Sequence, residues 1–259
     1  MTDFNDDPAV GKPLTAVTAH LQQTRETLQT ICQSLGLEAV AGIGVLKFAG
    51  EVNGRLITLT AAPRTRTRYL TPDIRRRHYH GFVVDVSAAT TAKTRLLLTP
   101  PSAQWLHRLI QPRYGNQQLT NLPPRYDQLT VWAHDPDWAT GFLGKTAVNH
   151  LLATLLDDNG KPNGNVLYLS PDTCRLTVAA LPATPTEATV RQWVEAVSQL
   201  TTLAEQNPPH KQASLTWLER QPANTRLFIT AGGLLFGIPL LFFICCLLPI
   251  LAALLLTAN

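Results

Sequence analysis

Residues 43–60 read IGVLKFAGEVNGRLITLT, and this stretch predicts the first hairpin of an antiparallel sheet. Its two ends, 43–48 and 56–60, are apolar-rich runs of the length of a strand. Between them stands the step Asn53-Gly54, whose residue types tolerate the positive φ angles that a two-residue hairpin turn requires. The two runs therefore pair antiparallel across this turn.

More strands of the same sheet are expected on the C-terminal side of the hairpin. Residues 82–86 and 95–98 are apolar or alternate in polarity, so they should pair in the same antiparallel sheet. Residues 102–110 then predict a short helix, and the stretch 111–125, which contains three prolines, predicts a long loop.

A second unit is expected in the order strand, helix, strand, strand, helix. Its elements are a strand at 128–133, a helix that begins at Asp135-Pro136, a hairpin of 166–169 with 175–180, and a helix that follows the capping box at 184–187. The predicted fold class is therefore α+β, with one or two antiparallel sheets and packed helices, followed by a C-terminal transmembrane helix.

This second unit carries a resemblance to a group of proteins. The strand region reading YDQLTVWAHDPDWA at 126–139, with the helix, hairpin and last helix after it, resembles uncharacterised bacterial membrane-anchored proteins of unknown function. The strand start at Gly54-Arg55 is also similar, and the resemblance covers about residues 45–205. It implies an α+β fold and no particular activity.

Residues 227–258 form a run of 32 residues without a charged side chain. A bilayer core needs about 20 helical residues, and a straight helix of this run would measure about 48 Å. We therefore predict a membrane anchor that tilts, or kinks at Pro239 or Pro249; a hairpin that re-enters the same leaflet is the alternative. Gly233 and Gly237 have the spacing that lets two membrane helices pack closely, in a homodimer or with another subunit.

The flanks of this run predict its orientation. The residues before it include His210, Lys211, Arg220 and Arg226 against Glu219, whereas only Asn259 follows it. Positive flanks favour the cytoplasmic side, and the acidic first residues, MTDFNDDPAV, lack the apolar core of a signal peptide. We therefore expect a single-pass, tail-anchored membrane protein with a cytoplasmic N-terminal domain and a juxtamembrane linker at 207–226.

The N-terminal part is expected to hold an acidic flexible tip, 1–13, and an amphipathic helix, 14–36, ahead of a cytoplasmic α+β domain at 40–206. Apolar residues recur along the helix in steps of three and four, at Leu14, Val17, Leu21, Leu28, Ile31 and Leu35, with Thr24 in the one polar position of the stripe. This stripe either packs on the protein's own domain or forms a coiled-coil contact with a partner, and its short length favours the first interpretation.

Basic residues are concentrated between 61 and 113, where ten Lys or Arg stand against only Asp73 and Asp85. This segment carries a formal charge of +8, while the whole chain carries +4. The residues expected to form a contact face are Arg64, Arg66, Arg68, Arg75, Arg76 and Arg77. The first three alternate, so a strand would point them to one face, and the last three are interpreted as part of an exposed basic loop.

Several roles for this basic segment stay open at the level of the sequence. It is a plain solvated face, a contact for anionic lipid, or a contact for an acidic protein partner. On a protein tethered to the cytoplasmic leaflet, anionic lipid attracts each Lys or Arg near the surface by roughly 1 kcal/mol. Nucleic acid is not the expected partner, because the patch is short and has few interleaved aromatic residues.

No pattern in the chain predicts a catalytic or metal site, and no cofactor is expected. His78 and His80 could share a strand face, but no third ligand follows at a suitable spacing and three arginines precede them. The pair His134-Asp135 resembles a fragment of metal-dependent hydrolases, yet Asp135 already suits a helix N-cap. The four cysteines are interpreted as small apolar side chains in a reducing compartment, not as a disulfide framework.

The function predicted from these features is a non-enzymatic, tail-anchored accessory or scaffold protein that binds a membrane complex or a soluble partner. Two alternatives belong to other classes. One is a membrane-surface enzyme acting on a lipid or envelope substrate, which requires a deep pocket that contains His134, Asp135 or His150. The other is an anionic-lipid-binding module. The expected partners are the membrane and a protein, or a second copy of the chain.

Overall fold

The computed structural model describes residues 7–41, 45–69, 75–101, 104–158, 161–181 and 185–221. The predicted anchor at 227–258, with Gly233 and Gly237, lies outside these residues. Within the described ranges, no helix combines the length and the apolar composition that crossing a bilayer requires.

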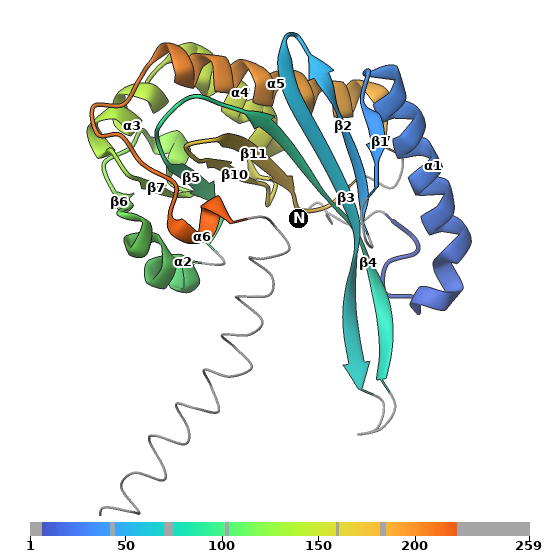
Figure 1. Cartoon of the computed structure of the whole chain (residues 1–259). Helices are drawn as coiled ribbons and strands as arrows, with labels where there is room; N and C mark the ends of the chain where they lie inside the picture. Colours follow the sequence, from blue (N-terminus) through green and yellow to red (C-terminus); the bar gives the residue numbers. More distant parts are fainter. Residues whose placement is uncertain are drawn as a thin grey trace, which may run out of the picture. The chain divides into compact units, whose positions relative to one another are not determined.

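A nine-stranded antiparallel sheet forms the centre of the fold, with the strand order β1-β2-β3-β4-β11-β10-β5-β7-β6 (Figure 1). Its strands are β1 (Glu38–Val40), β2 (Leu46–Val52), β3 (Arg55–Tyr69), β4 (Arg75–Ala89), β5 (Leu96–Thr99), β6 (Gln117–Leu119), β7 (Thr130–Ala133), β10 (Val166–Leu169) and β11 (Thr173–Val178). A separate short pair joins β8 (Asp157–Asp158) and β9 (Lys161–Pro162). The predicted α+β class with an antiparallel sheet is confirmed.

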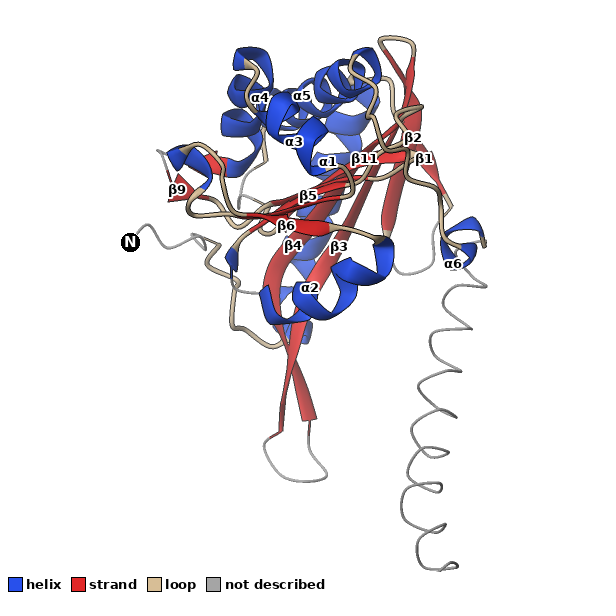
Figure 2. Cartoon of the chain, turned by 90° about the vertical axis from the view of Figure 1, so that its left-hand side faces the viewer, coloured by secondary structure: helices blue, strands red, loops and turns tan. Residues whose placement is uncertain are grey.

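Helices lie on both sides of this sheet, with α3, α4 and α5 on one side and α2 on the other (Figure 2). The helices are α1 (Thr18–Ser34), α2 (Gln104–Ile110), α3 (Pro136–Leu143), α4 (Thr146–Leu156), α5 (Glu187–Gln206) and α6 (Trp217–Arg220), with 3-10 turns η1 (Leu14–Val17), η3 (Gln111–Tyr114) and η4 (Pro124–Tyr126). The described chain divides into two compact units, Met1–Ser214 and Leu215–Asn259.

The predicted hairpin at 43–60 is present as β2 and β3, although residues 43 and 44 lie outside the described part. Asn53 and Gly54 form its turn with φ angles of 53° and 75°. Because both angles lie in the left-handed region, this turn matches the right-handed twist of the paired strands.

The two predicted sections of the domain share one sheet. The hairpin β10–β11 inserts between β4 and β5, so that β11 pairs with β4 and β10 pairs with β5. The strands predicted at 82–86 and 95–98 therefore belong to the same sheet, as expected, but two strands from later in the chain separate them.

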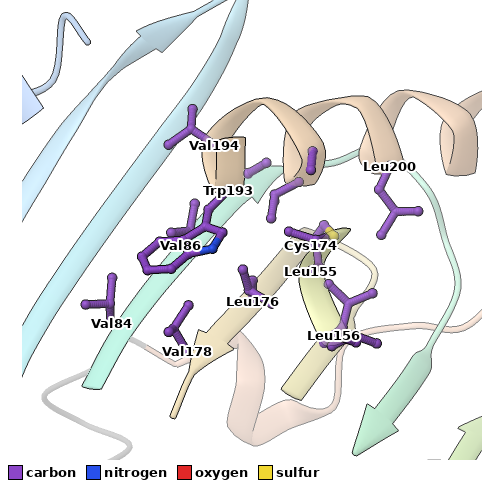
Figure 3. Close-up of a cluster of buried hydrophobic side chains, with 14 of the residues drawn as sticks. Val84, Val86, Leu155, Leu156, Cys174, Leu176, Val178, Trp193, Val194 and Leu200 are labelled. Atoms are coloured by element: carbon purple, nitrogen blue, oxygen red, sulfur yellow. The ribbon is translucent and has the colours of Figure 1, made fainter. Parts of the chain in front are cut away.

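The core lies on the sheet face that α5 covers (Figure 3). Trp193 and Val194 of α5 pack there over valines and leucines of β4 and β11, such as Val86 and Leu176. The thiol of Cys174 is buried in the same cluster, and burial raises its pKa to about 12. This thiol behaves as a small apolar side chain, as predicted.

The apolar stripe of α1 also packs inside the domain. Its side chains at Val17, Leu21, Leu28 and Ile31 are buried, and so is Thr24 in the polar position of the stripe. The stripe therefore serves the protein's own core, as the first of the two interpretations expected.

Three local predictions need correction. The helix expected after Asp135 is two helices, α3 and α4, because the chain breaks at Gly144. The loop expected at 111–125 contains β6 between η3 and η4. The last helix of the domain has Thr186 as its N-cap, whose hydroxyl accepts from the Thr189 N–H, instead of a capping box that starts at residue 184.

The compact unit that starts at Leu215 contains α6, which begins with a capping box. The Thr216 N–H donates to the Glu219 carboxylate at 2.7 Å, and the Glu219 N–H donates to the Thr216 hydroxyl at 3.3 Å. Trp217, the first residue of α6, is 66% exposed.

Candidate functional site

Two strands of the sheet are much longer than their neighbours. The pairing of β2 with β3 ends at Ala61, and the pairing of β11 with β4 ends at Val84. Beyond these residues β3 and β4 pair with each other and project from the sheet as a two-stranded ribbon (Figures 1 and 2). We call residues 64–69 and 75–80 the arm; residues 70–74, which connect its strands, lie outside the described part.

A β-bulge marks the root of the arm. The register of the two strands shifts between Pro63 and Thr65, so that Arg64 stands opposite both His80 and Gly81. Gly81 has a φ angle of 84°, a left-handed conformation that glycine adopts at little cost. A bulge increases the local twist of a strand pair, which turns the arm relative to the sheet.

All six arginines predicted as a contact face lie on the arm, three on each strand. Arg75, Arg76 and Arg77 belong to β4, so the exposed basic loop predicted for them is wrong. In the register of the arm, Arg68 stands opposite Arg76 and Thr67 stands opposite Arg77. Neighbouring positions of a strand face opposite ways, so the arm carries arginine positions on both faces.

The arginine side chains of the arm are available for a partner. Arg64, Arg66, Arg76 and Arg77 are exposed. None of the four makes an ion pair or hydrogen bond with another residue of the described chain, whereas Arg55, Arg175 and Arg191 each pair with a carboxylate elsewhere. The arm therefore presents a concentration of positive charge that the rest of the described domain leaves uncompensated.

A segment near the N-terminus holds the arm at its root. The Gly11 N–H donates to the Tyr79 carbonyl at 2.8 Å, and the Tyr79 N–H donates to the Lys12 carbonyl at 3.0 Å. The His78 Nδ1–H donates to the Gly11 carbonyl at 2.7 Å, and Pro13 forms a bridge with His78. Residues 11–13 thus lie along the outer edge of β4, joined to it by backbone hydrogen bonds and an isolated β-bridge.

Side chains reinforce this attachment. Tyr79 is 1% exposed and makes edge-on ring contacts with His20 of α1 and with Phe82, with centroids 5.8 and 6.2 Å apart. Asp7 accepts from the Ala9 N–H at 2.8 Å and contacts His20 Nε2 at 3.1 Å. Burial, together with the negative charge of Asp7, raises the pKa of the Tyr79 phenol above its usual range. We call residues 7–13, which belong to the predicted acidic tip, the N-terminal strap.

The pair His134-Asp135 has a structural role. Asp135 is 1% exposed, and its carboxylate accepts from the Trp138 N–H at the start of α3 and from the Lys211 N–H at 2.8 Å. Burial favours the neutral form of Asp135, but the backbone N–H groups of Lys211, Trp138 and His210 outweigh it and hold the pKa of the carboxyl below its ordinary value. Both carboxylate oxygens are therefore engaged in holding the chain.

His150 lines an open groove of about 440 Å³ between α4 and α5, with Leu151 and Leu203 among its neighbours. Neither His134 nor Asp135 lines this groove. In the described ranges, no group of three or more His, Cys, Asp or Glu side chains is placed to hold a metal ion. The deep pocket that the enzyme alternative requires is not formed by the described residues around His150.

Arg95, counted in the basic segment, is buried instead of exposed. Its guanidinium donates to the Tyr168 hydroxyl at 2.7 Å and to the Ser214 carbonyl at 2.8 Å, and it lies 4.9 Å from the centroid of the Tyr114 ring. Sequence reasoning missed this role; the apolar run that follows Arg95 was the signal that it begins a buried strand.

Residues 207–214, the first part of the predicted linker, are bound to the domain. The Trp138 Nε1–H donates to the Asn207 carbonyl at 2.6 Å, and the Ala213 N–H donates to the Lys93 carbonyl at 2.7 Å. With the contact between Arg95 and Ser214, this segment carries the chain from the end of α5 to the sheet face opposite α5, where Tyr168 also lies.

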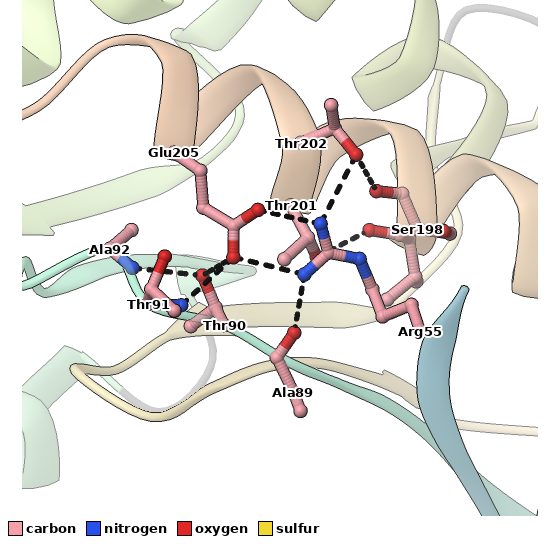
Figure 4. A network of polar contacts seen from close by, with 10 residues as sticks. Arg55, Ala89, Thr90, Thr91, Ala92, Ser198, Thr201, Thr202 and Glu205 are labelled. Atoms are coloured by element: carbon pink, nitrogen blue, oxygen red, sulfur yellow. Dashed lines mark hydrogen bonds and ion pairs between the residues drawn. The ribbon is translucent and has the colours of Figure 1, made fainter. Parts of the chain in front are cut away.

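A second polar cluster joins the start of β3 to the end of α5 (Figure 4). Arg55 and Glu205 form two hydrogen bonds, of 2.9 and 2.6 Å, and the Glu205 carboxylate also accepts from the Thr91 N–H at 2.8 Å and the Thr90 hydroxyl at 3.1 Å. The hydrogen bonds from Arg55 contribute most to lowering the pKa of Glu205 to about 2. This cluster fastens α5 to the ends of β3 and β4 that lie farthest from the arm.

Comparison with known proteins identifies no family. No family model matches the chain, and no curated protein matches it. Among solved structures, the chain is similar to the mycobacterial trehalose monomycolate transport factor A, TtfA, with a TM-score of 0.46 and 10% sequence identity over 73% of this chain and 98% of that chain. This degree of similarity carries no conclusion about the activity or partners of the present protein.

Proposed function

We propose that this protein is a tail-anchored accessory or scaffold protein whose cytoplasmic domain binds a membrane-associated partner through the arm. The observation that carries the proposal is the arm itself, a paired ribbon on which four exposed arginines have no partner in the described chain. The charge-free run at 227–258 supports the membrane part of the proposal.

The arm's charges are better explained by binding than by folding. The positions of Arg68 and Arg76 stand directly opposite each other, and like charges at opposite positions of two strands are destabilising. Charged side chains also keep exposed strand edges from pairing with other chains, but that role does not require arginines on both faces of the ribbon. Six arginines on one ribbon are therefore accounted for by a negatively charged partner.

The tether keeps such a partner within reach. Ser214 is the last residue of the first compact unit, and the charge-free run starts at Leu227. The twelve residues between them extend to about 45 Å at most. An inserted anchor would therefore hold the domain within that distance of the bilayer.

The experiment that tests this function compares two variants of the full-length chain in its own membranes. The arm variant is R64Q/R66Q/R76Q/R77Q, and the control variant is R25Q/R108Q/R113Q/R125Q. Both lose four positive charges from exposed arginines that lack a partner among the described residues, so they differ only in where the charge is removed.

Two readouts separate the parts of the proposal. Retention in the membrane pellet after alkaline carbonate extraction tests the anchor, and all three chains should be retained. Mild-detergent purification then tests the accessory role. The same membrane protein should copurify in stoichiometric amount with the wild type and the control variant, and it should be absent from the purified arm variant. Extraction by carbonate would overturn the anchor, and recovery of the wild-type chain alone would overturn the accessory role.

A further inference from the structure

We infer that the arm binds the phosphate headgroups of an anionic bilayer and that the N-terminal strap holds it in position to do so. This inference rests on the proposed function, because it takes the membrane beside the domain as the arm's partner. It specifies that the arm contacts lipid phosphate. It also assigns a positioning role to residues 7–13, whose attachment to the arm involves none of the arm's arginines.

The surface of the arm fits headgroups better than a folded protein. Protein interfaces obtain most of their binding energy from a few large apolar or aromatic side chains in a desolvated centre. Among the side chains that the structure describes, the exposed large hydrophobic ones are Val40, Val45, Leu56, Leu109 and Trp217, and none of them belongs to the arm. Binding to lipid phosphate needs no such centre, since arginine can donate two parallel hydrogen bonds to one phosphate group.

The distribution of arginines over both faces of the arm also favours lipid headgroups over a folded protein. Arg66 and Arg77 occupy positions of opposite parity across the paired strands, and both are exposed. A ribbon bound to the surface of a protein presents one face to it and leaves the other in water. A ribbon lying among headgroups meets phosphates on both faces and along its edges, so every arginine of the arm finds a counter-charge.

The direction of the arm also agrees with a membrane contact. The arm extends beyond the sheet, away from α5 (Figure 1). The chain reaches the end of the first unit at Ser214, where Arg95 binds it on the sheet face opposite α5. The arm and Ser214, the last residue of the first unit, therefore both lie away from the α5 layer.

The strap limits the freedom of the arm. A two-stranded ribbon alone is marginally stable in water. The backbone hydrogen bonds of Gly11 and Lys12 with Tyr79, and the buried Tyr79 ring against His20 of α1, fix the root of the ribbon to the domain. A fixed ribbon loses less conformational entropy when its arginines are bound, so its affinity for the surface is higher.

The test uses the full-length chain in lipid nanodiscs made of phosphatidylcholine alone or with about one third phosphatidylglycerol. The readout is amide hydrogen exchange of residues 64–69 and 75–80. Beyond Ala61, β3 has no neighbour on its outer edge in the described chain, so its outward amides exchange rapidly unless another surface covers them. We expect slower exchange in the arm with phosphatidylglycerol, and a return to the neutral-disc rate in about 1 M salt.

The number of arginines removed in each variant determines the expected loss of lipid-dependent protection. An attraction of roughly 1 kcal/mol per arginine corresponds to about a fivefold change in the equilibrium for each arginine removed. The arm variant R64Q/R66Q/R76Q/R77Q should therefore lose the protection by phosphatidylglycerol entirely, while the control variant R25Q/R108Q/R113Q/R125Q should keep it. Equal exchange of the wild-type arm in both kinds of disc would overturn lipid as the partner and leave an acidic protein in its place.

The strap is tested separately by Gly11→Pro. Proline removes the N–H that binds the Tyr79 carbonyl and cannot adopt the φ angle of 83° at this position, yet it changes no charge. The arm of this variant should exchange faster in neutral discs and show weaker protection in anionic discs than wild type. Unchanged protection would overturn the positioning role of the strap. Carbonate extraction of the same chains reports on the anchor, so failure of the proposed function is recognised independently.

Discussion

Glu205 offers the sharpest test of the forces that hold the arm's strands to the domain. Its carboxylate accepts from both Arg55 Nη atoms, the Thr91 N–H and the Thr90 hydroxyl (Figure 4). The side chains of Arg55 and Glu205 are 17% and 21% exposed, so water screens the pair only in part. We predict that Glu205→Gln destabilises the domain substantially at pH 7 and little at pH 2.

The magnitude follows from the pKa of Glu205. The Arg55 hydrogen bonds, foremost among the causes, lower the pKa from 4.5 to about 2. Each pH unit of difference between the folded and unfolded pKa corresponds to about 1.4 kcal/mol, so the ionised carboxylate stabilises the fold by about 3 kcal/mol. Because the folded pKa is the lower one, this stabilisation is fully present above pH 4.5 and is lost as the pH falls toward 2.

The assay is urea unfolding of a chain that ends at Ser214, where the first compact unit ends, followed between pH 7 and pH 2. At pH 7 the Glu205→Gln chain should be less stable by about 3 kcal/mol, which corresponds to a melting temperature lower by about 6–12 °C. The difference from wild type should narrow below pH 4.5.

The matched control is Glu187→Gln, which removes the exposed carboxylate that pairs with Arg191 four residues later on α5. Exposed pairs contribute little, so this chain should unfold like wild type at every pH. A Glu205→Gln defect of the same size at pH 3 and pH 7, or a defect no larger than that of the control, would refute the linkage reasoning.

Four further substitutions test other parts of the fold. Trp193→Ala should cost about 3–5 kcal/mol in urea unfolding, because it empties the buried space that this ring fills against β4 and β11. Gly50→Ala should lower the melting temperature, since its new Cβ would stand 2.3 Å from the Gly36 carbonyl oxygen, whereas Gly141→Ala, with nothing within 4 Å on helix α3, should raise stability by about 0.5–1 kcal/mol. Asp135→Ala should speed tryptic cleavage after Lys211, because it removes both the cap of α3 and the acceptor for the Lys211 N–H.

Local patterns in the sequence predicted the parts of the fold that depend on local chemistry. The turn at Asn53-Gly54 needs left-handed backbone, and the start of α3 needs an acceptor at Asp135; both requirements are visible in a few residues. The stripe of α1 likewise follows from helical periodicity. These predictions were confirmed because neighbours in the sequence decide them.

The order of the strands in the sheet could not be predicted from local sequence patterns. Nothing near β4 indicates that its second partner is β11, almost ninety residues later, since that pairing depends on how two apolar faces meet α5. The break between α3 and α4 was missed for a related reason. The apolar pattern continues through Gly144, and only the packing of the two helices shows that the chain changes direction there.

Burial of polar residues was the other source of error. Arg95 looked like one more charge in a basic segment, but its partners, Tyr168 and Ser214, come from distant parts of the chain. Residues 1–13 were expected to form an acidic flexible tip, yet within it Asp7 is 7% exposed and contacts His20. A polar residue can be buried wherever the fold supplies partners, and a single sequence does not indicate where those partners are.

The contrast between Arg95 and the arm explains why charge alone was an incomplete guide to the candidate site. Ten basic residues stand between 61 and 113. The fold uses Arg95 as a buried donor, whereas Arg64, Arg66, Arg76 and Arg77 are exposed and make no ion pair or hydrogen bond with another described residue. Buried charge is tolerated when hydrogen bonds compensate for lost water, and exposed charge needs no such compensation. Within the described domain, these four exposed arginines have no partner that accounts for their concentration on one ribbon. In the proposed membrane contact, a surface dense in phosphate would supply a counter-charge to all four of them.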